Sequence, residues 1–297
     1  MQFWLMGALI APEEMVEIAA AAEELGFYGV SLSDHLFVPK ELSAPYPYSD
    51  DGAPPFSGET AFPDPWVTIA GMAARTSRLR FSTNVYLGPL RHPLLVAKAI
   101  ATADRIAGGG RVSLGLAPGW MPEEYTTLGL DFDDRGTRLN EWIDAFQALG
   151  RPGWVEHHGA FYDFGPLQIA PIADAAIPIL GGGHTKPALR RAAERCDGWI
   201  GANYAVGDAI ALATQVHDAL DRAGRSADVF EIRVGLLGLP DPEAVSALSG
   251  AGISGVFAAP WRPDRPMSTQ QRIDALGRYS QRFILPIAAA LTTEEPI

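Results

Sequence analysis

Apolar runs of strand length alternate with amphipathic stretches of helix length along the whole chain. The first apolar run, at 2–7, precedes a stretch at 12–25 whose apolar residues recur every three or four positions, as on one face of a helix. Pro12 is typical of a first helical turn, and Gly26 of the residue that ends a helix. The same pattern predicts further strands at 28–33, 79–86, 111–117, 177–180, 197–202, 230–238 and 255–259, and further helices at 65–76, 93–107, 134–149, 185–195, 206–223, 242–248 and 268–290.

Strict alternation of strand and helix is typical of a parallel sheet with right-handed crossovers. Eight such units in 297 residues fit the size of a (β/α)8 TIM barrel. A doubly wound sheet would carry a dinucleotide fingerprint after the first strand, and the segment GALIAP does not match one. We therefore expect an α/β fold, a single barrel domain over 1–297, with a long loop after the second strand and a small hairpin insertion near 154–164.

The composition narrows the context and the partners. The chain has 35 acidic and 23 basic residues, a formal net charge of −12, and no basic stripe, so nucleic acid is not an expected partner. The apolar runs are too short for a bilayer span, and the first residues lack the basic region of a secretory signal. Cys196 is the only cysteine, which fits a reducing compartment and a buried side chain. We expect a cytoplasmic protein that does not bind membranes.

Barrels of this kind place function at the carboxyl ends of their strands. A metal centre is not expected, because no H-x-H pair follows the first strand. Ser33, Asp34 and His35 are adjacent in the chain, an arrangement that does not suit a serine relay. His157 and His158 fall in the predicted hairpin and are expected at the surface.

Three consecutive glycines, Gly181 to Gly183, stand between a predicted strand and a predicted helix. A tight turn needs only one, so three indicate that a ligand approaches the backbone closely. The free N–H groups that open a helix favour an anion. We interpret the segment as a site for a phosphate-type ligand, with Lys186, Arg190 and Arg191 as local positive charge.

The segment 39–65 is longer than most loops and is rich in proline and aromatic residues. Because it begins soon after His35, it should overhang the barrel mouth. We expect a lid or pocket wall that shields the chemistry from water, the alternative being a tethered surface loop.

The block RFSTNVYLGPLRHP through RGTRLNEWIDAF (80–146) resembles the luciferase-like monooxygenase family. The order of motifs carries the resemblance: R-x-P opening a helix, G-G-R before a strand, then G-W, E-E-x-x-x-x-G and R-G-x-R-x-x-E. GGGHTKPALRRAAERCDGWI follows where the family has a Gly-Gly turn, a helix and D-G-W. The match runs from the first strand to about residue 202 and is weaker beyond. The family includes flavin-dependent monooxygenases and oxidoreductases that use the deazaflavin coenzyme F420.

The resemblance implies a barrel with an isoalloxazine-type ring at the carboxyl ends of the strands, and a homodimer. Many barrels hold phosphate after strands seven and eight, whereas the glycine segment here follows the fifth predicted strand. Thr83 and Asn84 match a strand end where a non-proline cis peptide often supports the ring. The implied cofactor contacts are Thr83, Asn84, Ala117, Gly119, Trp120, Tyr125, Gly181, Gly182, Gly183, His184 and Thr185.

Two cofactors compete. The stretch SLSDH, which ends in Asp34 and His35, resembles the second-strand end of the deazaflavin-using branch. It favours coenzyme F420 and hydride transfer to or from a small organic substrate, with His35 as the main acid–base residue and Asp34 holding the local geometry. The alternative is reduced flavin mononucleotide (FMN) reacting with oxygen in a monooxygenase. The net charge of −12 favours that alternative slightly, because F420 carries an anionic tail. A reductase for the flavin or for F420 is a further expected partner.

Two other classes stay open. A metal-free barrel hydrolase or isomerase would use Glu123, Glu124, Asp133 or Asp134 as acid and base, although solvated carboxylates at a helix start explain these residues as well. A non-catalytic flavin-binding protein is the other.

Overall fold

A computed structural model describes residues 1–49, 51–227, 229–261 and 265–287. Its main sheet is parallel and closes on itself, because β1 pairs with both β2 and β11 and β3 pairs with β5. The eight strands of the ring are, in order, β1 (Gln2–Met6), β2 (Gly29–Leu32), β3 (Arg80–Thr83), β5 (Val112–Ala117), β8 (Ile179–Gly182), β9 (Gly198–Tyr204), β10 (Glu231–Leu236) and β11 (Gly255–Ala258). The prediction of a (β/α)8 barrel is confirmed, and the doubly wound alternative is wrong.

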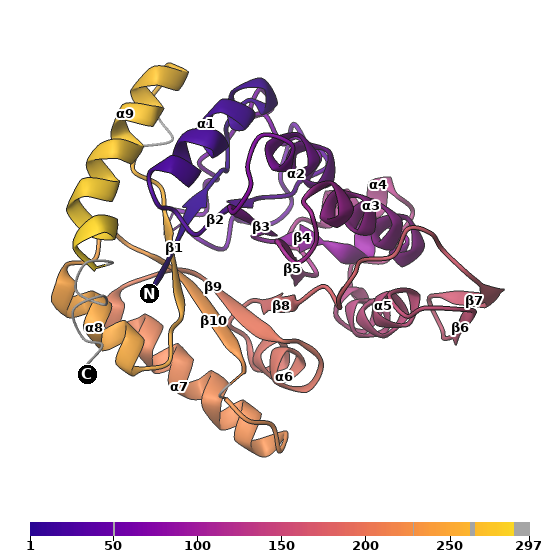
Figure 1. The fold of residues 1–297 in the computed structure, drawn as a ribbon. Coiled ribbons are helices and arrows are strands. Elements are labelled where there is room, and N and C mark those ends of the chain that lie inside the picture. The colour runs from indigo at the N-terminus through magenta and orange to yellow at the C-terminus, as the bar shows by residue number, and fades with distance from the viewer. Residues whose placement is uncertain (50, 228, 262–264, 288–297) are drawn as a thin grey trace, which may run out of the picture.

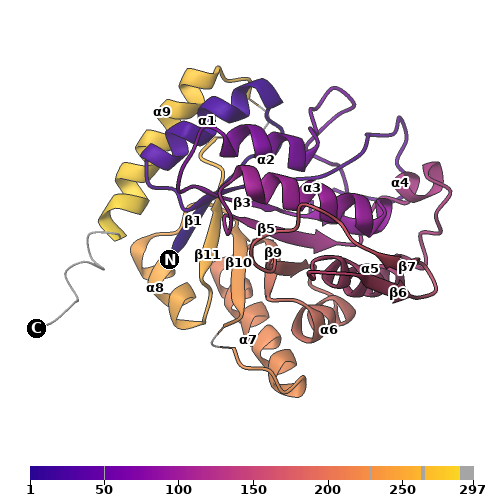
Figure 2. The ribbon, with the colours of Figure 1, turned by 45° about the vertical axis from the view of Figure 1, so that its right-hand side comes forward.

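Helices surround the strands (Figures 1 and 2). In the described part of the chain none of them is long and apolar enough to cross a membrane. They are α1 (Pro12–Glu24), α2 (Pro65–Ala73), α3 (Pro93–Ile106), α4 (Pro122–Thr127), α5 (Arg135–Leu149), α6 (Lys186–Arg195), α7 (Val206–Arg222), α8 (Pro242–Gly250) and α9 (Thr269–Tyr279).

The helix starts follow from local chemistry. Proline occupies the first turn of α1, α2, α3, α4, α6 and α8, where its missing N–H costs nothing. Side-chain oxygens cap several of them: Asp64 accepts from two N–H groups of α2, and Ser268 forms a capping box with Gln271 at α9. Short-range sequence signals therefore fix most boundaries.

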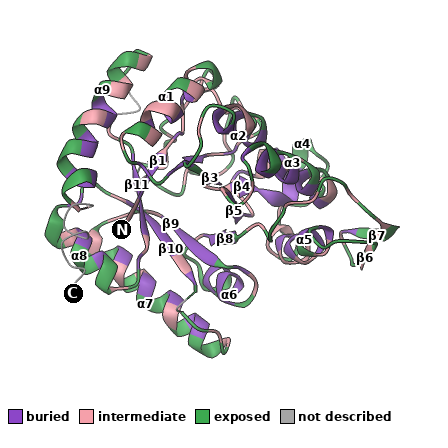
Figure 3. Cartoon of the chain, in the orientation of Figure 1, coloured by how far each residue is buried: buried purple, intermediate pink, exposed green. Residues whose placement is uncertain are grey.

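The core has two layers. Most buried apolar residues lie between the strands and the helices, and Figure 3 shows them along the strands and on the inward helix sides. A smaller cluster fills the barrel interior, made of Trp4, Leu180, Ile200 and Phe257 with Met6 and Val85 against it. Arg233, 3% exposed, stacks 3.7 Å from the centre of the Trp4 ring and pairs with Glu231. The barrel is thus a packed core.

The predicted hairpin insertion is present as β6 (Val155–His158) and β7 (Asp163–Leu167). Glu141 holds its turn, because the carboxylate accepts the N–H groups of Ala160, Phe161 and Tyr162 at 2.7–3.0 Å. Glu141 is the last residue of the R-G-x-R-x-x-E motif on α5. That motif position therefore anchors the insertion to the barrel.

Two details differ from the sequence prediction. The predicted strand 79–86 breaks into β3 and β4 (Tyr86–Leu87). The break falls at the peptide between Asn84 and Val85, which is cis, as the family resemblance implies for this strand end. The last helix passes through a π-helical turn, η2 (Ser280–Ile284), where the Ser280 hydroxyl donates to the Leu25 carbonyl at 2.6 Å. Residues 288–290 of that predicted helix lie outside the described residues.

A glycine in β5 tests how closely the strands approach. A Cβ built on Gly115 would lie 1.9 Å from the carbonyl oxygen of Thr83 and 2.6 Å from Ile200 Cδ1. We expect Gly115→Ala to lower the free energy of unfolding by at least about 3 kcal/mol, because backbone must move to relieve the overlap. Denaturant titration measures this.

The matched control is Gly277→Ala in α9, where an added Cβ meets no atom within 4 Å. That change should raise stability by about 0.4–1 kcal/mol by restricting the unfolded chain. If the two variants were equally stable, a Cβ added at position 115 would not overlap the Thr83 carbonyl as the structure indicates.

Candidate active site at the carboxyl ends of the strands

Asp34 stands at the corner that follows β2 and is 4% exposed. Its carboxylate accepts two hydrogen bonds from the Arg91 guanidinium, at 2.7 and 2.8 Å, and one from the Leu87 N–H at 2.9 Å. Arg91 in turn lies 4.5 Å from the centre of the Tyr86 ring. Asp34 therefore ties the end of β2 to the chain around β4 and η1 (Gly88–Leu90).

His35 is the next residue, and its side chain is 11% exposed. Its Nδ1 lies 3.3 Å from each carboxylate oxygen of Glu124, and Oε1 of Glu124 also accepts the Leu36 N–H at 2.8 Å. Glu124 is fully buried. Nε2 of His35 makes no hydrogen bond to the residues that the structure describes. The buried carboxylate thus engages one ring nitrogen and leaves the other for a ligand.

Aromatic rings surround His35, two from the long loop after β2 and one, that of Trp120, from the segment after β5. Ring centres of Phe56, Phe62 and Trp120 lie 5.6, 5.0 and 6.0 Å from that of His35. Tyr46 packs edge-on against Phe56 and Trp120, and burial raises the pKa of its phenol to about 12. This arrangement makes the segment a wall around His35, and whether it also moves as a lid stays a prediction.

The E-E pair at the start of α4 holds this loop in place. Glu124 binds His35 and the Leu36 N–H, and Glu123 accepts the Ser43 N–H at 2.6 Å. The view that Glu124 is a solvated helix-start carboxylate is therefore wrong. Asp134 pairs with Arg138 one turn along α5.

The ends of β3, β5 and β8 meet inside the barrel mouth. The Thr83 hydroxyl donates to the Gly115 carbonyl at 2.7 Å, and the Asn84–Val85 peptide bond is cis. A Cβ on Gly182 would lie 2.9 Å from Val85 Cγ1 and 3.4 Å from Ala117 Cβ. Four of the predicted cofactor contacts, Thr83, Asn84, Ala117 and Gly182, therefore belong to one patch of the structure.

The glycine segment does not form one turn as expected. Gly181 and Gly182 belong to β8, and a Cβ on Gly181 would press 3.1 Å from Ala192 Cβ of α6. Only Gly183 lies in the turn, with φ of +105° that disfavours other residues. Close strand–helix packing accounts for Gly181 without a ligand.

Three backbone N–H donors directly after Gly183 have no partner among the described residues. Thr185 caps α6 by accepting the Ala188 N–H, and Trp199 Nε1 donates to the Gly183 carbonyl at 2.8 Å. The N–H groups of His184, Thr185 and Lys186 donate to no atom of the described residues. Three free N–H groups at a helix start suit an anion.

Two of the predicted cofactor contacts, Gly119 and Tyr125, have structural roles. Gly119 has φ of +84°, and a Cβ there would lie 3.2 Å from Leu87 Cδ2. Tyr125 is 1% exposed in a small cluster with Leu87 and Leu90, and its hydroxyl donates to the Pro118 carbonyl. The structure therefore places Trp120 beside His35, whereas the Tyr125 side chain is buried in the small apolar cluster.

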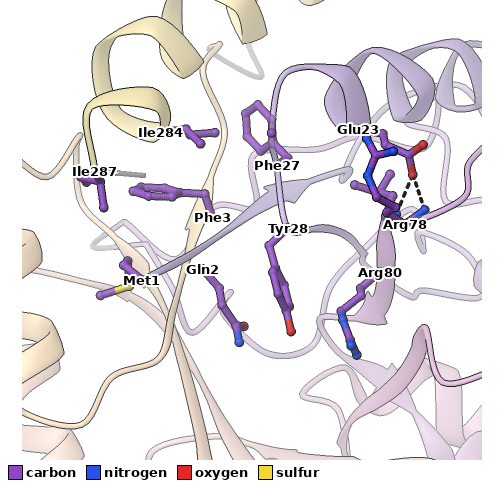
Figure 4. A pocket seen from close by; sticks show the side chains of 12 residues that line it. Met1, Gln2, Phe3, Glu23, Phe27, Tyr28, Arg78, Arg80, Ile284 and Ile287 are labelled. Atoms are coloured by element: carbon purple, nitrogen blue, oxygen red, sulfur yellow. Dashed lines mark hydrogen bonds between the residues drawn. The ribbon is translucent and has the colours of Figure 1, made fainter. Parts of the chain in front are cut away.

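A pocket of about 450 Å³ opens at the other end of the barrel, around the amino ends of β1, β2 and β3. Figure 4 shows Phe3 and Ile284 on one side of it and Arg80 on the other. None of the predicted site residues lines it. Within the described ranges no group of three or more His, Cys, Asp or Glu side chains is placed to hold a metal ion.

The sequence model of luciferase-like monooxygenases matches residues 3–274. The chain belongs to this family. An uncharacterized protein of Mycobacterium tuberculosis, Rv0940c, is 35% identical over 263 residues, which cover 86% of this chain and 90% of the relative. An F420-dependent glucose-6-phosphate dehydrogenase of Microbacterium testaceum is 30% identical and matches 75% of this chain and 64% of its own. The crystal structure of monooxygenase RslO1 from Streptomyces bottropensis superposes with a TM-score of 0.74 at 20% identity, covering 97% of this chain and all of that one.

This luciferase-like oxidoreductase uses two residues that the sequence did not single out for these roles. Arg91 is the R of the R-x-P motif, and Glu124 belongs to the E-E motif. Their partners lie 57 and 89 positions away in the chain. The motifs drew attention to both residues, but only the fold shows that they converge on Asp34 and His35.

Replacing Asp34 with Asn should strongly destabilise this oxidoreductase. The change leaves the Arg91 charge in a mostly buried place without its carboxylate, and we expect the free energy of unfolding to fall by about 3 kcal/mol. The control is Asp174→Asn, which removes a carboxylate from the exposed ion pair with Arg105 and should cost less than about 1 kcal/mol. Chemical denaturation of both variants checks this; equal losses would contradict the role of the Asp34 pair.

Proposed function

We propose that this protein is a coenzyme F420-dependent oxidoreductase that transfers hydride to or from a small organic substrate. The observation that carries the proposal is the state of His35, which is held at Nδ1 by the buried Glu124 and keeps Nε2 open in an aromatic enclosure. The F420-dependent relative and the SLSDH strand end support the choice of cofactor.

Acid–base chemistry follows from that arrangement. The Glu124 carboxylate would accept a hydrogen bond from the Nδ1–H of His35, which favours the tautomer in which Nε2 carries the free electron pair. Nε2 would take the proton of a substrate hydroxyl as the carbon loses hydride, and would return it in the reverse direction. When bound, the deazaflavin supplies hydride exchange without using oxygen.

The chain's own residues fit such a cofactor. Gly182, Val85 and Ala117 pack closely at the barrel mouth, because a Cβ on Gly182 would lie 2.9 Å from Val85 Cγ1 and 3.4 Å from Ala117 Cβ, and these residues would form the surface against which a ring lies. The free N–H groups of His184, Thr185 and Lys186 would bind its phosphate. Phe56, Phe62 and Trp120 would exclude water from the reacting atoms.

A homodimer and a reductase of F420 or flavin are the proposed protein partners. Val67 of α2 and Leu95 of α3 are 74% and 68% exposed, and these two helices pack side by side. Exposed large apolar residues on neighbouring helices suit a second copy of the chain.

A cofactor titration tests the proposal. We expect the purified protein to bind F420 at least tenfold more tightly than FMN, a difference of about 1.4 kcal/mol, and to exchange hydride between F420 and one member of a panel of small alcohols. Cofactor fluorescence and absorbance measure both. Tighter binding of FMN, with oxygen consumption by the reduced flavin, would establish the monooxygenase alternative. Binding of neither would leave the hydrolase or isomerase class.

His35→Asn should reduce turnover by about 10²–10⁴, because Asn cannot transfer the proton. The affinity for the cofactor should change much less, since the proposed phosphate donors lie between the end of β8 and the first residue of α6. His158→Asn in the exposed hairpin is the control and should keep full turnover. If His35→Asn stays within a few-fold of the unmodified enzyme, His35 is structural and the proton comes from another group.

A further inference from the structure

The pocket of about 450 Å³ lies at the amino end of the barrel, away from His35. Its volume is within the range of small-molecule sites and would hold on the order of fifteen groups of the size of a water molecule. Its walls come from the first residues of β1, the turn between α1 and β2, the start of β3 and the chain around the end of η2. The pocket shares no residue with the proposed hydride-transfer site, so the ligand of that site does not account for it.

One side of the pocket is apolar. Figure 4 shows the side chains of Phe3, Phe27, Ile284 and Ile287 gathered there. Phe3 and Phe27 are supported from behind, because both rings contact that of Tyr279, at centroid distances of 6.1 and 5.8 Å. Such a wall favours a hydrocarbon surface, which gains free energy by leaving water.

The other side of the pocket is polar, and its side-chain acceptors are already engaged. The Glu23 carboxylate accepts the three consecutive backbone N–H groups of residues 77–79, at 2.7–3.1 Å, and two of these bonds are drawn in Figure 4 or lie beside them. Oε1 of Gln2 accepts the Nε1–H group of Trp4 at 3.1 Å. The two acceptor side chains of this wall are thus used within the protein.

The donors on the polar side are largely free. Arg80 uses one guanidinium nitrogen for a backbone carbonyl, at 3.1 Å, and lies 5.3 Å from the centre of the Tyr28 ring. Neither Arg80 nor Arg78 forms an ion pair with any residue that the structure describes. The Gln2 amide NH2 group and the Tyr28 hydroxyl donate to none of the described atoms either. With two arginines and the single carboxylate of Glu23, the lining keeps an excess of positive charge.

We propose that this pocket binds a monocarboxylate with an apolar body, the chemistry of a medium-chain fatty acid. The carboxylate pairs with Arg80, whose planar guanidinium suits it, and the hydrocarbon lies on Phe3 and Ile284. Decanoate has about twelve non-hydrogen atoms, which fits a pocket of this size. The bound acid joins the chain after η2 to the start of β3, so it stabilises the folded protein by mass action.

Calorimetric titration with decanoate tests the charged side of the site. We expect one molecule to bind per chain, and butyrate and decanol each to bind at least tenfold more weakly, because the first lacks the apolar body and the second the charge. Arg80→Gln should weaken decanoate binding at least tenfold. The control is Arg75→Gln, a change at an exposed arginine outside the pocket, which should leave the affinity unchanged.

The apolar side is tested by Ile287→Asp, which places a carboxylate on that wall and should also weaken decanoate binding at least tenfold. Its control is Leu285→Asp, because Leu285 is 54% exposed and does not line the pocket. Circular dichroism verifies that the variants fold, and each of the two pocket variants tests the site without the other.

The proposal would be overturned if decanoate did not bind, if decanol bound equally well, or if the pocket variants lost no more affinity than their controls. None of these measurements uses F420 or FMN. The fatty-acid site and the proposed function therefore stand or fall separately.

Discussion

The candidate site depends on one buried ion pair, between Asp34 and Arg91. The Asp34 side chain is 2% exposed. Its carboxylate accepts two hydrogen bonds from the Arg91 guanidinium and one from the Leu87 N–H. These three bonds join the end of β2 to the segment that follows the cis peptide after β3. Because His35 is the next residue, its backbone position is set by this pair, and Glu124 then sets the direction of its ring. The position of His35 thus depends on two buried carboxylates, those of Asp34 and Glu124.

The second constraint on the site is the close packing of the barrel interior and of the strand ends above it. The barrel interior is filled by the side chains of Trp4, Leu180, Ile200 and Phe257. The mouth of the barrel is therefore shallow. Gly182 is part of this packing, because a Cβ at that position would lie 2.9 Å from Val85 Cγ1. A larger residue there would displace Val85 and change the surface on which the proposed function places a ring.

The fold was predictable because its signals are local. Proline at helix starts, caps such as Asp64, and runs of buried residues lie within a few positions of the boundaries they determine. The site was predictable only in part. Strand ends indicated where His35 and Asn84 would lie, but the burial of Glu124 depends on contacts 88 and 89 positions apart, which no periodicity encodes. The glycine run shows the same limit: only Gly183 needs its φ, whereas Gly181 is small because α6 packs on it.

The predicted contacts follow the barrel in the order of the chain. Residues 34–35, 83–84, 117–120 and 182–185 end β2, β3, β5 and β8, which are consecutive neighbours in the ring. At about 4.8 Å per strand this arc is roughly 14 Å long. A small substrate would touch one part of it, whereas an elongated ligand with a ring near His35 and an anion near Lys186 would span it.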